Sequence, residues 1–249
     1  MSESEKRFSK QADLYARYRP DYPEELYSFI FDHLDQLNTA WDCATGTGQV
    51  ANYLANHFEQ VIANDISEEQ LSYAPEKANI TYLNTPAGHS GLPSNTFDLI
   101  TIAQAIHWLN FEQFYDEVRR TARKNALLAV IGYGMVRLDQ KSNLIIDDLY
   151  EEAFGTYFSK NRKYLDDHYR NIPFPFDEIP TPDFEITYKW SLDHLEGYFN
   201  SWSAIQKIKA EQSKNPTDKA IEQIRQKLGN PARVEVTFPL FMRLGKIIK

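Results

Sequence analysis

The first half of the chain alternates between two patterns of apolar positions. Short apolar runs end near residues 44, 65, 83, 102 and 133, and between them apolar residues recur three and four positions apart. The short runs are typical of buried strands, whereas the wider spacing is typical of amphipathic helices. Strands that alternate with helices predict a doubly wound α/β fold with a mostly parallel sheet and helices on both faces.

The same patterns predict seven strands in all and a single domain, 1–249. Residues 8–135 form the sheet core, residues 136–230 an added helical cover, and residues 234–241 a closing strand. The expected strands are 39–44, 60–65, 80–83, 97–102, 127–133, 184–190 and 234–240. The expected helices are 8–18, 24–37, 50–58, 67–74, 110–124, 192–211 and 221–228, with more helix between 139 and 170.

Charge and composition narrow the range of partners. The chain has 27 Lys and Arg against 35 Asp and Glu, a formal net charge of −8. Nucleic acids and anionic membranes are bound through basic surfaces, so neither partner is predicted. The first residues lack an apolar signal segment and no apolar run reaches membrane-spanning length, which predicts a cytoplasmic protein. The sequence makes no prediction of oligomeric state.

Cysteine and histidine usage gives no sign of a disulfide framework or a metal site. Cys43 is the only cysteine, and it falls inside the first predicted strand. No His, Cys or Asp cluster has the spacing of metal ligands, and no Ser–His or Cys–His arrangement suggests a covalent intermediate. Catalysis by bound metal or by a covalent nucleophile is therefore not predicted.

A tight turn with Gly46 and Gly48 separates the first predicted strand from the next helix. Glycine suits such a turn because it adopts positive φ and lets a ligand approach the backbone. The helix that follows directs unpaired N–H groups and its positive dipole end toward the same space. This arrangement predicts a site for a carboxylate or a phosphate group.

Asp65 ends the second predicted strand, 17 positions after Gly48. In a doubly wound sheet, an acid at this place holds a ribose through its hydroxyls. Nicotinamide cofactors and S-adenosylmethionine (SAM) both present a ribose there. SAM is favoured because Asp42, just before the turn, would attract an ammonium group and repel a pyrophosphate, and because the third glycine of the dinucleotide motif is missing.

The run Asp42-x-x-Thr45-Gly46-Thr47-Gly48 resembles motif I of the class I SAM-dependent methyltransferases, with Ala44 at the place of the usual first glycine. The resemblance implies that SAM is the cofactor and S-adenosyl-L-homocysteine the product. Asp65 would hold the ribose, Ile66 would lie on the adenine, and Gln104 would face the methionine part. The implied cofactor-binding residues are Tyr15, Asp42, Ala44, Thr45, Gly46, Gly48, Asp65, Ile66, Ala87, Gly88, His89 and Gln104.

Three shorter signatures resemble a narrower branch, the small-molecule enzymes that include trans-aconitate methyltransferase. They are the segment 15–23, His107-Trp108, and Ser201-Trp202-Ser203. The resemblance implies that Tyr18, Arg19, Trp108 and Trp202 bind the substrate and that His107 is catalytic. Each also has a plainer explanation: the tryptophans as core residues, Arg19 as a solvated charge, and His107 as a surface or capping residue. A carboxylate acceptor needs only an arginine or a histidine to hold it, whereas a hydroxyl or carbon acceptor needs a base, for which His107 is the candidate. Whether Arg19 holds the substrate or the methionine carboxylate of SAM stays open.

The function that these observations predict is SAM-dependent methyl transfer to a small molecule, possibly a carboxylate. Two alternatives stay open. One is a SAM- or nucleotide-binding module without turnover, which would share the fold. The other is a nicotinamide-dependent oxidoreductase, which Asp42 and the missing glycine disfavour.

Overall fold

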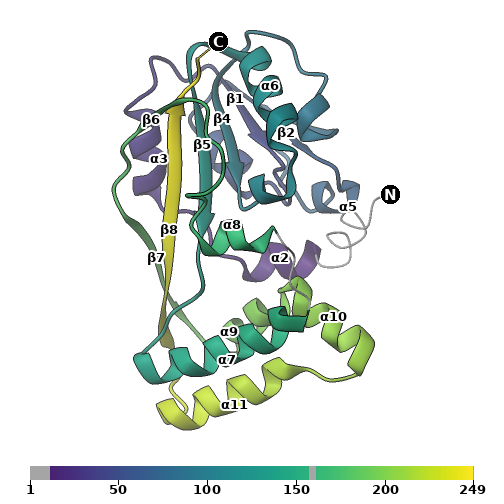
Figure 1. The fold of residues 1–249 in the computed structure, drawn as a ribbon, viewed down its shortest axis with the longest axis vertical. Coiled ribbons are helices and arrows are strands. Elements are labelled where there is room, and N and C mark those ends of the chain that lie inside the picture. The colour runs from purple at the N-terminus through teal and green to yellow at the C-terminus, as the bar shows by residue number, and fades with distance from the viewer. Residues whose placement is uncertain (1–11, 157–160, 249) are drawn as a thin grey trace.

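The central sheet of the computed structural model, which describes residues 12–156 and 161–248, is mostly parallel (Figure 1). The strand order is β3-β2-β1-β4-β5-β8-β6, and β1 to β5 are parallel to one another. The predicted doubly wound α/β fold is confirmed. The parallel strands are β1 (Thr39–Cys43), β2 (Gln60–Asp65), β3 (Ile80–Asn84), β4 (Phe97–Ala103) and β5 (Ala122–Tyr133).

Three antiparallel strands complete the sheet, so it has eight strands rather than the seven expected. They are β6 (Asp177–Ile179), β7 (Phe184–Trp190) and the long β8 (Val234–Lys246). One end of β8 pairs with β5 and β6, and its beginning pairs with β7. The sequence missed β6 because three residues are too few to show a periodic pattern.

Helices cover both faces of the parallel sheet, which places its strands in the interior. The helices α3 (Glu24–Phe31) and α4 (Gln49–Leu54) pack on the face that carries Ala40 and Leu99. The helix α6 (Phe111–Thr121) packs on the opposite face, against Trp41 and Ile100. Successive strand residues therefore contribute to different cores, as the alternation of a pleated strand requires.

The helices α6 and α5 (Glu68–Leu71) begin at side-chain caps, Asn110 and Ser67, which are the first residues of the two expected helices. The side chain of Asn110 accepts the N–H of Gln113 at 3.1 Å, and Ser67 accepts the N–H of Gln70 at 3.2 Å. The expected end of α6 at residue 124 is wrong. The helix ends at Thr121 and β5 starts at the next residue, where Ala122 pairs with Phe97 of β4 and Arg123 forms an ion pair with Asp98.

A lobe of helices lies beyond one end of the sheet, at the far end of the ribbon formed by β7 and β8 (Figure 1). It consists of α7 (Gln140–Thr156), α9 (Leu192–Asn200), α10 (Ser203–Gln212) and α11 (Pro216–Leu228). The expected single helix 192–211 is two helices, because the chain breaks at Ser201 and Trp202. The short helices α2 (Ala12–Tyr18) and α8 (Arg162–Asp166) lie between lobe and sheet. The expected start of the first helix at residue 8 lies outside the described residues.

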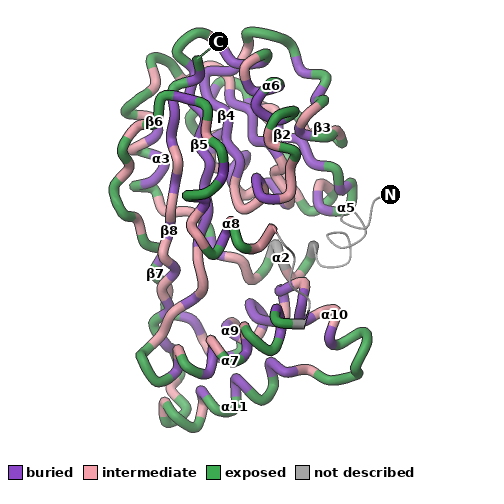
Figure 2. Tube along the Cα trace, viewed as in Figure 1, coloured by how far each residue is buried: buried purple, intermediate pink, exposed green. Residues whose placement is uncertain are grey.

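Buried residues run along the strands and the inner sides of the helices (Figure 2). One hydrophobic cluster extends from the α3 face of the sheet into the lobe, where it includes Leu195, Phe199 and Ile221. The lobe is thus packed onto the same core as the sheet. Within residues 12–156 and 161–248, no helix has both the length and the apolar character to cross a membrane.

Candidate functional site

A cavity of about 210 Å³ lies at the carboxyl ends of β1, β2 and β4, between the sheet and the helical lobe. The predicted site residues that line it are Arg19, Asp42, Ala44, Thr45, Gly46, Asp65, Ile66, Ala87, Gln104, His107, Trp108 and Trp202. The structure therefore brings together most of the residues that the sequence singled out. Tyr18, Gly48, Gly88 and His89 do not line the cavity. The side chain of Tyr15 lies outside the described part of the chain.

The turn after β1 is left-handed at Ala44 (φ 53°), Gly46 (φ 59°) and Gly48 (φ 77°). Positive φ is unfavourable for alanine, so Ala44 is strained where glycine would not be. Gly48 is required by packing as well as by its backbone. A Cβ on Gly48 would lie 2.8 Å from the hydroxyl of Tyr82. Gly48 therefore packs closely on Tyr82, and it does not line the cavity.

Asp42 is buried at the end of β1, and the chain itself satisfies its carboxylate. The hydroxyls of Thr45 and Thr101 donate to it at 2.5 and 2.7 Å, and the N–H of Ala51 donates at 3.1 Å. Burial raises the pKa of Asp42 to about 6, although these hydrogen bonds act in the opposite direction. Asp42 therefore ties the glycine turn to α4 and β4 in addition to lining the cavity.

Asp65 lies at the end of β2 with its two oxygens held by backbone N–H groups. The N–H of Gly46 and the N–H of Ser67 each donate to it at 2.9 Å. Burial raises its pKa, and the backbone hydrogen bonds lower it. A carboxylate accepts more than one hydrogen bond per oxygen, so Asp65 can still accept a hydroxyl from a ligand in the cavity.

The loop after β3 reaches the cavity through Thr85 and Ala87. A Cβ on Gly88 would lie 3.0 Å from Cβ of Gln113, so Gly88 is needed where the turn η1 (Ala87–His89) packs on α6. The expected ligand contacts of Gly88 and His89 do not follow from this geometry.

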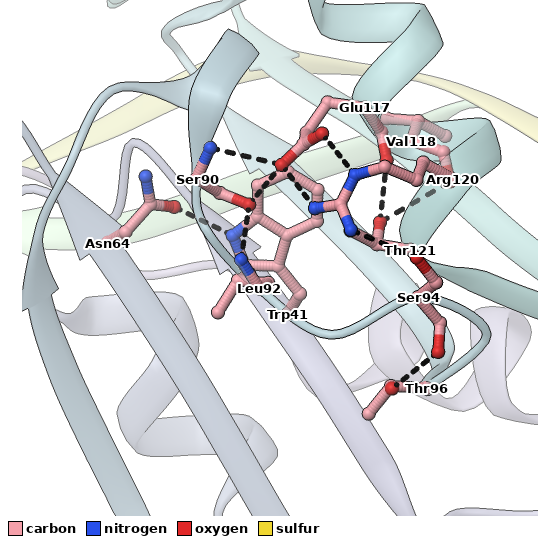
Figure 3. A network of polar contacts seen from close by, with 10 residues as sticks. All are labelled: Trp41, Asn64, Ser90, Leu92, Ser94, Thr96, Glu117, Val118, Arg120 and Thr121. Carbon is pink, nitrogen blue, oxygen red and sulfur yellow. Dashed lines mark hydrogen bonds and ion pairs between the residues drawn. The ribbon is translucent and has the colours of Figure 1, made fainter.

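Figure 3 shows the polar network that joins this loop to α6. The carboxylate of Glu117 accepts the N–H and hydroxyl of Ser90 and two donors from Arg120. Burial raises the pKa of Glu117, but the hydrogen bonds from Arg120 and Ser90 outweigh this effect and lower it overall. The loop that carries Ala87 is thus positioned by α6.

His107 and Trp108 lie in the turn η2 (Ile106–Trp108) after β4, and both line the cavity. His107 is buried, and its Nδ1 is 2.9 Å from the hydroxyl of Tyr169. Burial, with a smaller effect of the Arg162 charge, lowers the pKa of His107 to about 3. His107 is therefore neutral at pH 7, and it cannot supply the positive charge that the sequence analysis offered as one means of holding an acid.

Arg19 connects three parts of the chain at the cavity. Its Nε donates to the hydroxyl of Ser201 at 3.0 Å, and its Nη1 donates to the hydroxyl of Tyr133 at 3.1 Å. The guanidinium also lies 5.3 Å from the ring centre of Tyr198. Because Tyr133 ends β5 and Ser201 lies in the lobe, Arg19 is at the boundary between sheet and cover. Tyr18, beside it, packs on Gly197 and His194 instead.

Several cavity residues were not predicted as ligand contacts, and some of these come from the end of β5, from α8 and from the lobe. They include Tyr133, Phe154, Arg162 and Tyr198. The guanidinium of Arg162 lies 4.5 Å from the ring centre of Phe154 and 3.5 Å from the carboxylate of Asp166. Residues 150–169 contain many aromatic side chains, and this feature of the sequence could have identified the segment as part of the cavity wall.

Charge and polarity divide the cavity into two regions. Asp42 and Asp65 line the part beside the glycine turn, whereas Arg19 and Arg162 line the part that faces the lobe. Aromatic side chains also line the lobe side. Among the described residues, no group of three or more His, Cys, Asp or Glu side chains could hold a metal ion.

Comparison with known proteins identifies this kind of site. A family model described as a methyltransferase domain matches residues 41–130, which span β1 to most of β5. A Dictyostelium discoideum protein named as a methyltransferase is 31% identical over 248 residues, which cover 96% of this chain and 94% of the relative. The chain belongs to the class I SAM-dependent methyltransferases. SAM, and not a nicotinamide cofactor, is therefore the cofactor of this methyltransferase.

Two further similarities agree with this assignment. A solved structure of a protein named as a type II methyltransferase, from Anaeromyxobacter dehalogenans, matches the methyltransferase with a TM-score of 0.85 and 33% identity. The match covers 93% of this chain and 99% of that one. A Saccharomyces cerevisiae protein named as a SAM-dependent methyltransferase is 28% identical over 64% of this chain, which spans 56% of that relative's length.

Proposed function

We propose that the methyltransferase transfers the methyl group of SAM to a small apolar molecule that carries a carboxylate, and that this carboxylate is the acceptor. The observation that carries the proposal is the lobe side of the cavity. Two guanidinium groups, Arg19 and Arg162, lie there among the side chains of Trp108, Phe154 and Trp202. Guanidinium forks suit carboxylates, and the aromatic walls suit an apolar body.

The turn side of the cavity fits SAM. Asp65 can accept the ribose hydroxyls, Ile66 and Ala87 can contact the adenine, and the left-handed turn at Gly46 lets the methionine part approach the backbone. Gln104 also lines the cavity, and its Nε2 donates to the carbonyl oxygen of Tyr133 at 2.9 Å. The bound cofactor supplies an activated methyl group on its sulfonium.

The residues of this chain then have one main task, which is alignment. Holding an acceptor oxygen in line with the methyl carbon and sulfur supplies about 7–11 kcal/mol toward such a transfer. A carboxylate is ionised at pH 7 and needs no base. Because the whole chain carries a net charge of −8, an anionic acceptor needs a local positive charge, which Arg19 and Arg162 supply.

The state of His107 favours a carboxylate over a neutral hydroxyl as acceptor. A hydroxyl or phenol must lose a proton during transfer, and His107 was the base that the sequence suggested. A general base works best with a pKa near the working pH, and the pKa of His107 is lowered to about 3. An acceptor that is already ionised avoids this requirement.

Turnover with matched acceptors tests this proposal. Apolar aliphatic and aromatic carboxylic acids are compared with their primary amides, which have nearly the same shape without the charge. We expect S-adenosyl-L-homocysteine to form with acids and at least about ten-fold less with amides, since a charge-assisted hydrogen bond contributes about 1.5–3 kcal/mol. Equal turnover of acids and amides, or turnover only of macromolecules retained by an ultrafilter, would refute it.

A further inference from the structure

Tyr169 contacts His107 from a segment that the sequence did not connect with the site. The hydroxyl of Tyr169 is 2.9 Å from Nδ1 of His107, and their ring centres are 5.8 Å apart. Tyr169 is fully buried and His107 is 4% exposed. Tyr169 itself does not line the cavity, whereas His107 does.

The backbone that carries Tyr169 has an unfavourable conformation. His168 (φ 53°) and Tyr169 (φ 60°) are consecutive non-glycine residues in the left-handed region. Such residues persist where the surrounding structure holds them, and they occur often at functional sites. Here Arg243 holds the turn, because its Nη1 donates to the carbonyl oxygens of Tyr169 and Ile172 at 3.2 and 2.6 Å.

Arg243 is in turn fixed by Glu178, which accepts its Nε and Nη2 at 2.8 Å each. The Tyr169 ring packs edge-on against Phe241, with ring centres 5.2 Å apart. A Cβ on Gly132 would lie 2.9 Å from the Tyr169 ring, so β5 leaves room for it only because residue 132 is glycine. Three strands thus fix the Tyr169 hydroxyl against His107.

We propose that Tyr169 is a positioning residue whose hydroxyl donates to Nδ1 of His107 and so keeps the proton of the neutral ring on Nε2. An imidazole nitrogen is a stronger acceptor than a phenol oxygen, which sets the direction of this hydrogen bond. His107 then offers the cavity an N–H donor instead of a basic nitrogen. The donor orients an oxygen of the acceptor and removes no proton from it.

This inference rests on the proposed methyl acceptor, but it predicts a property of the enzyme without any acceptor. The tautomer of His107 can be read from long-range nitrogen–hydrogen NMR correlations of labelled enzyme, with the signal assigned through the variant His107→Gln. We expect the proton on Nε2 in the parent enzyme and a mixture of tautomers in Tyr169→Phe. A proton on Nδ1 in the parent, or the same tautomer in both, would overturn the inference.

Tyr115→Phe is the matched control for this measurement. Tyr115 is also buried, and its hydroxyl donates to the carbonyl oxygen of Pro173, just beyond the Tyr169 turn. It removes a hydroxyl from the same neighbourhood without touching His107. We expect Tyr115→Phe to leave the tautomer unchanged. A change as large as that in Tyr169→Phe would mean that the effect arises from general loosening, and the inference would fail.

The kinetics of conservative variants show whether His107 acts as a hydrogen-bond donor or as a general base. The side-chain amide of glutamine places an N–H near the position of Nε2, but it cannot take up a proton. With any acceptor that turns over, we expect Tyr169→Phe to lower kcat about ten-fold, the equivalent of one hydrogen bond. His107→Gln should retain at least about ten-fold more activity than His107→Ala, on the same basis.

If glutamine is no better than alanine at position 107, His107 does not act as an N–H donor. If no acid turns over while the NMR result holds, the proposed function fails and the His107–Tyr169 assignment stands.

Discussion

Arg19 and Tyr133 join the N-terminal segment to the end of β5 through a hydrogen bond of 3.1 Å between Nη1 and the hydroxyl. The same guanidinium contacts Ser201 of the lobe. Arg19 is therefore both a cation at the cavity and a link between sheet and cover. The two roles can be separated by comparing a variant that removes the charge with one that removes only the hydrogen bond to Tyr133.

Arg19→Ala should raise KM for a carboxylate acceptor about ten- to a hundred-fold, because a charge-assisted pair contributes about 1.5–3 kcal/mol. Affinity for SAM, measured by calorimetry, should change little. Tyr133→Phe removes the same link but keeps the charge, so its KM should rise less than that of Arg19→Ala. Loss of SAM binding in Arg19→Ala would show that Arg19 holds the methionine carboxylate instead of the acceptor.

Asp65→Asn should weaken binding of S-adenosyl-L-homocysteine by about 1.5–3 kcal/mol, since a charged acceptor of the ribose hydroxyls is lost. Asp98→Asn is a matched control. Asp98 is another buried carboxylate that accepts two backbone N–H groups, from Asn38 and Thr39, but at the opposite end of the sheet. It should lower thermal stability and leave the calorimetric affinity unchanged. Equal affinities in both variants would remove Asp65 from the ribose site.

Asp42 should make the ligand-free enzyme less stable as pH rises. Its pKa is about 6 in the folded protein, above the ordinary value of 3.8, so folding favours its protonated form. The loss of stability that comes from ionising Asp42 in the folded protein is absent below pH 4, grows through pH 4–6 and is complete above pH 6. The free energy of unfolding of Asp42→Asn, relative to the parent, should therefore rise by about 2 kcal/mol between pH 4 and pH 7 in urea titrations. A flat difference would mean that Asp42 does not titrate in this range.

Ala44→Gly should relieve the left-handed strain in the turn. The strain is about 1–2 kcal/mol and the added freedom of the unfolded chain offsets part of it, which leaves a gain of about 0.5–1 kcal/mol in the free energy of unfolding. Ala40→Gly, in the preceding strand and fully buried, has no strain to relieve and should lose about 1 kcal/mol. Similar losses in both variants would contradict the strain at Ala44.

The sheet core could be predicted because each of its elements is a local pattern. The strands that end at Cys43 and Asp65, and the turn between Gly46 and Gly48, each show their spacing within a few residues. The additional strand β6 could not be predicted, since it is recognisable only by its pairing with β8.

The site was predictable where it follows strand ends and not where it depends on packing. Asp65 and Gln104 are at the cavity because parallel strands bring their carboxyl ends to one edge. Gly88 packs on α6 and does not line the cavity, and the sequence does not distinguish a glycine that makes room for a helix side chain from one that makes room for a ligand. The contact between His107 and Tyr169 joins residues 62 positions apart and left no local trace.

The most direct test of the proposed function is the chemical stability of the methylated product. Methyl-labelled SAM is incubated with the enzyme and an apolar carboxylic acid, and the product is then treated with mild alkali. Methyl esters hydrolyse and release the label as methanol, whereas methyl ethers and methylamines keep it. We predict that the label is released as methanol from a small-molecule product. Label that survives alkali, or that is found only on macromolecules, would contradict methyl transfer to a small carboxylate.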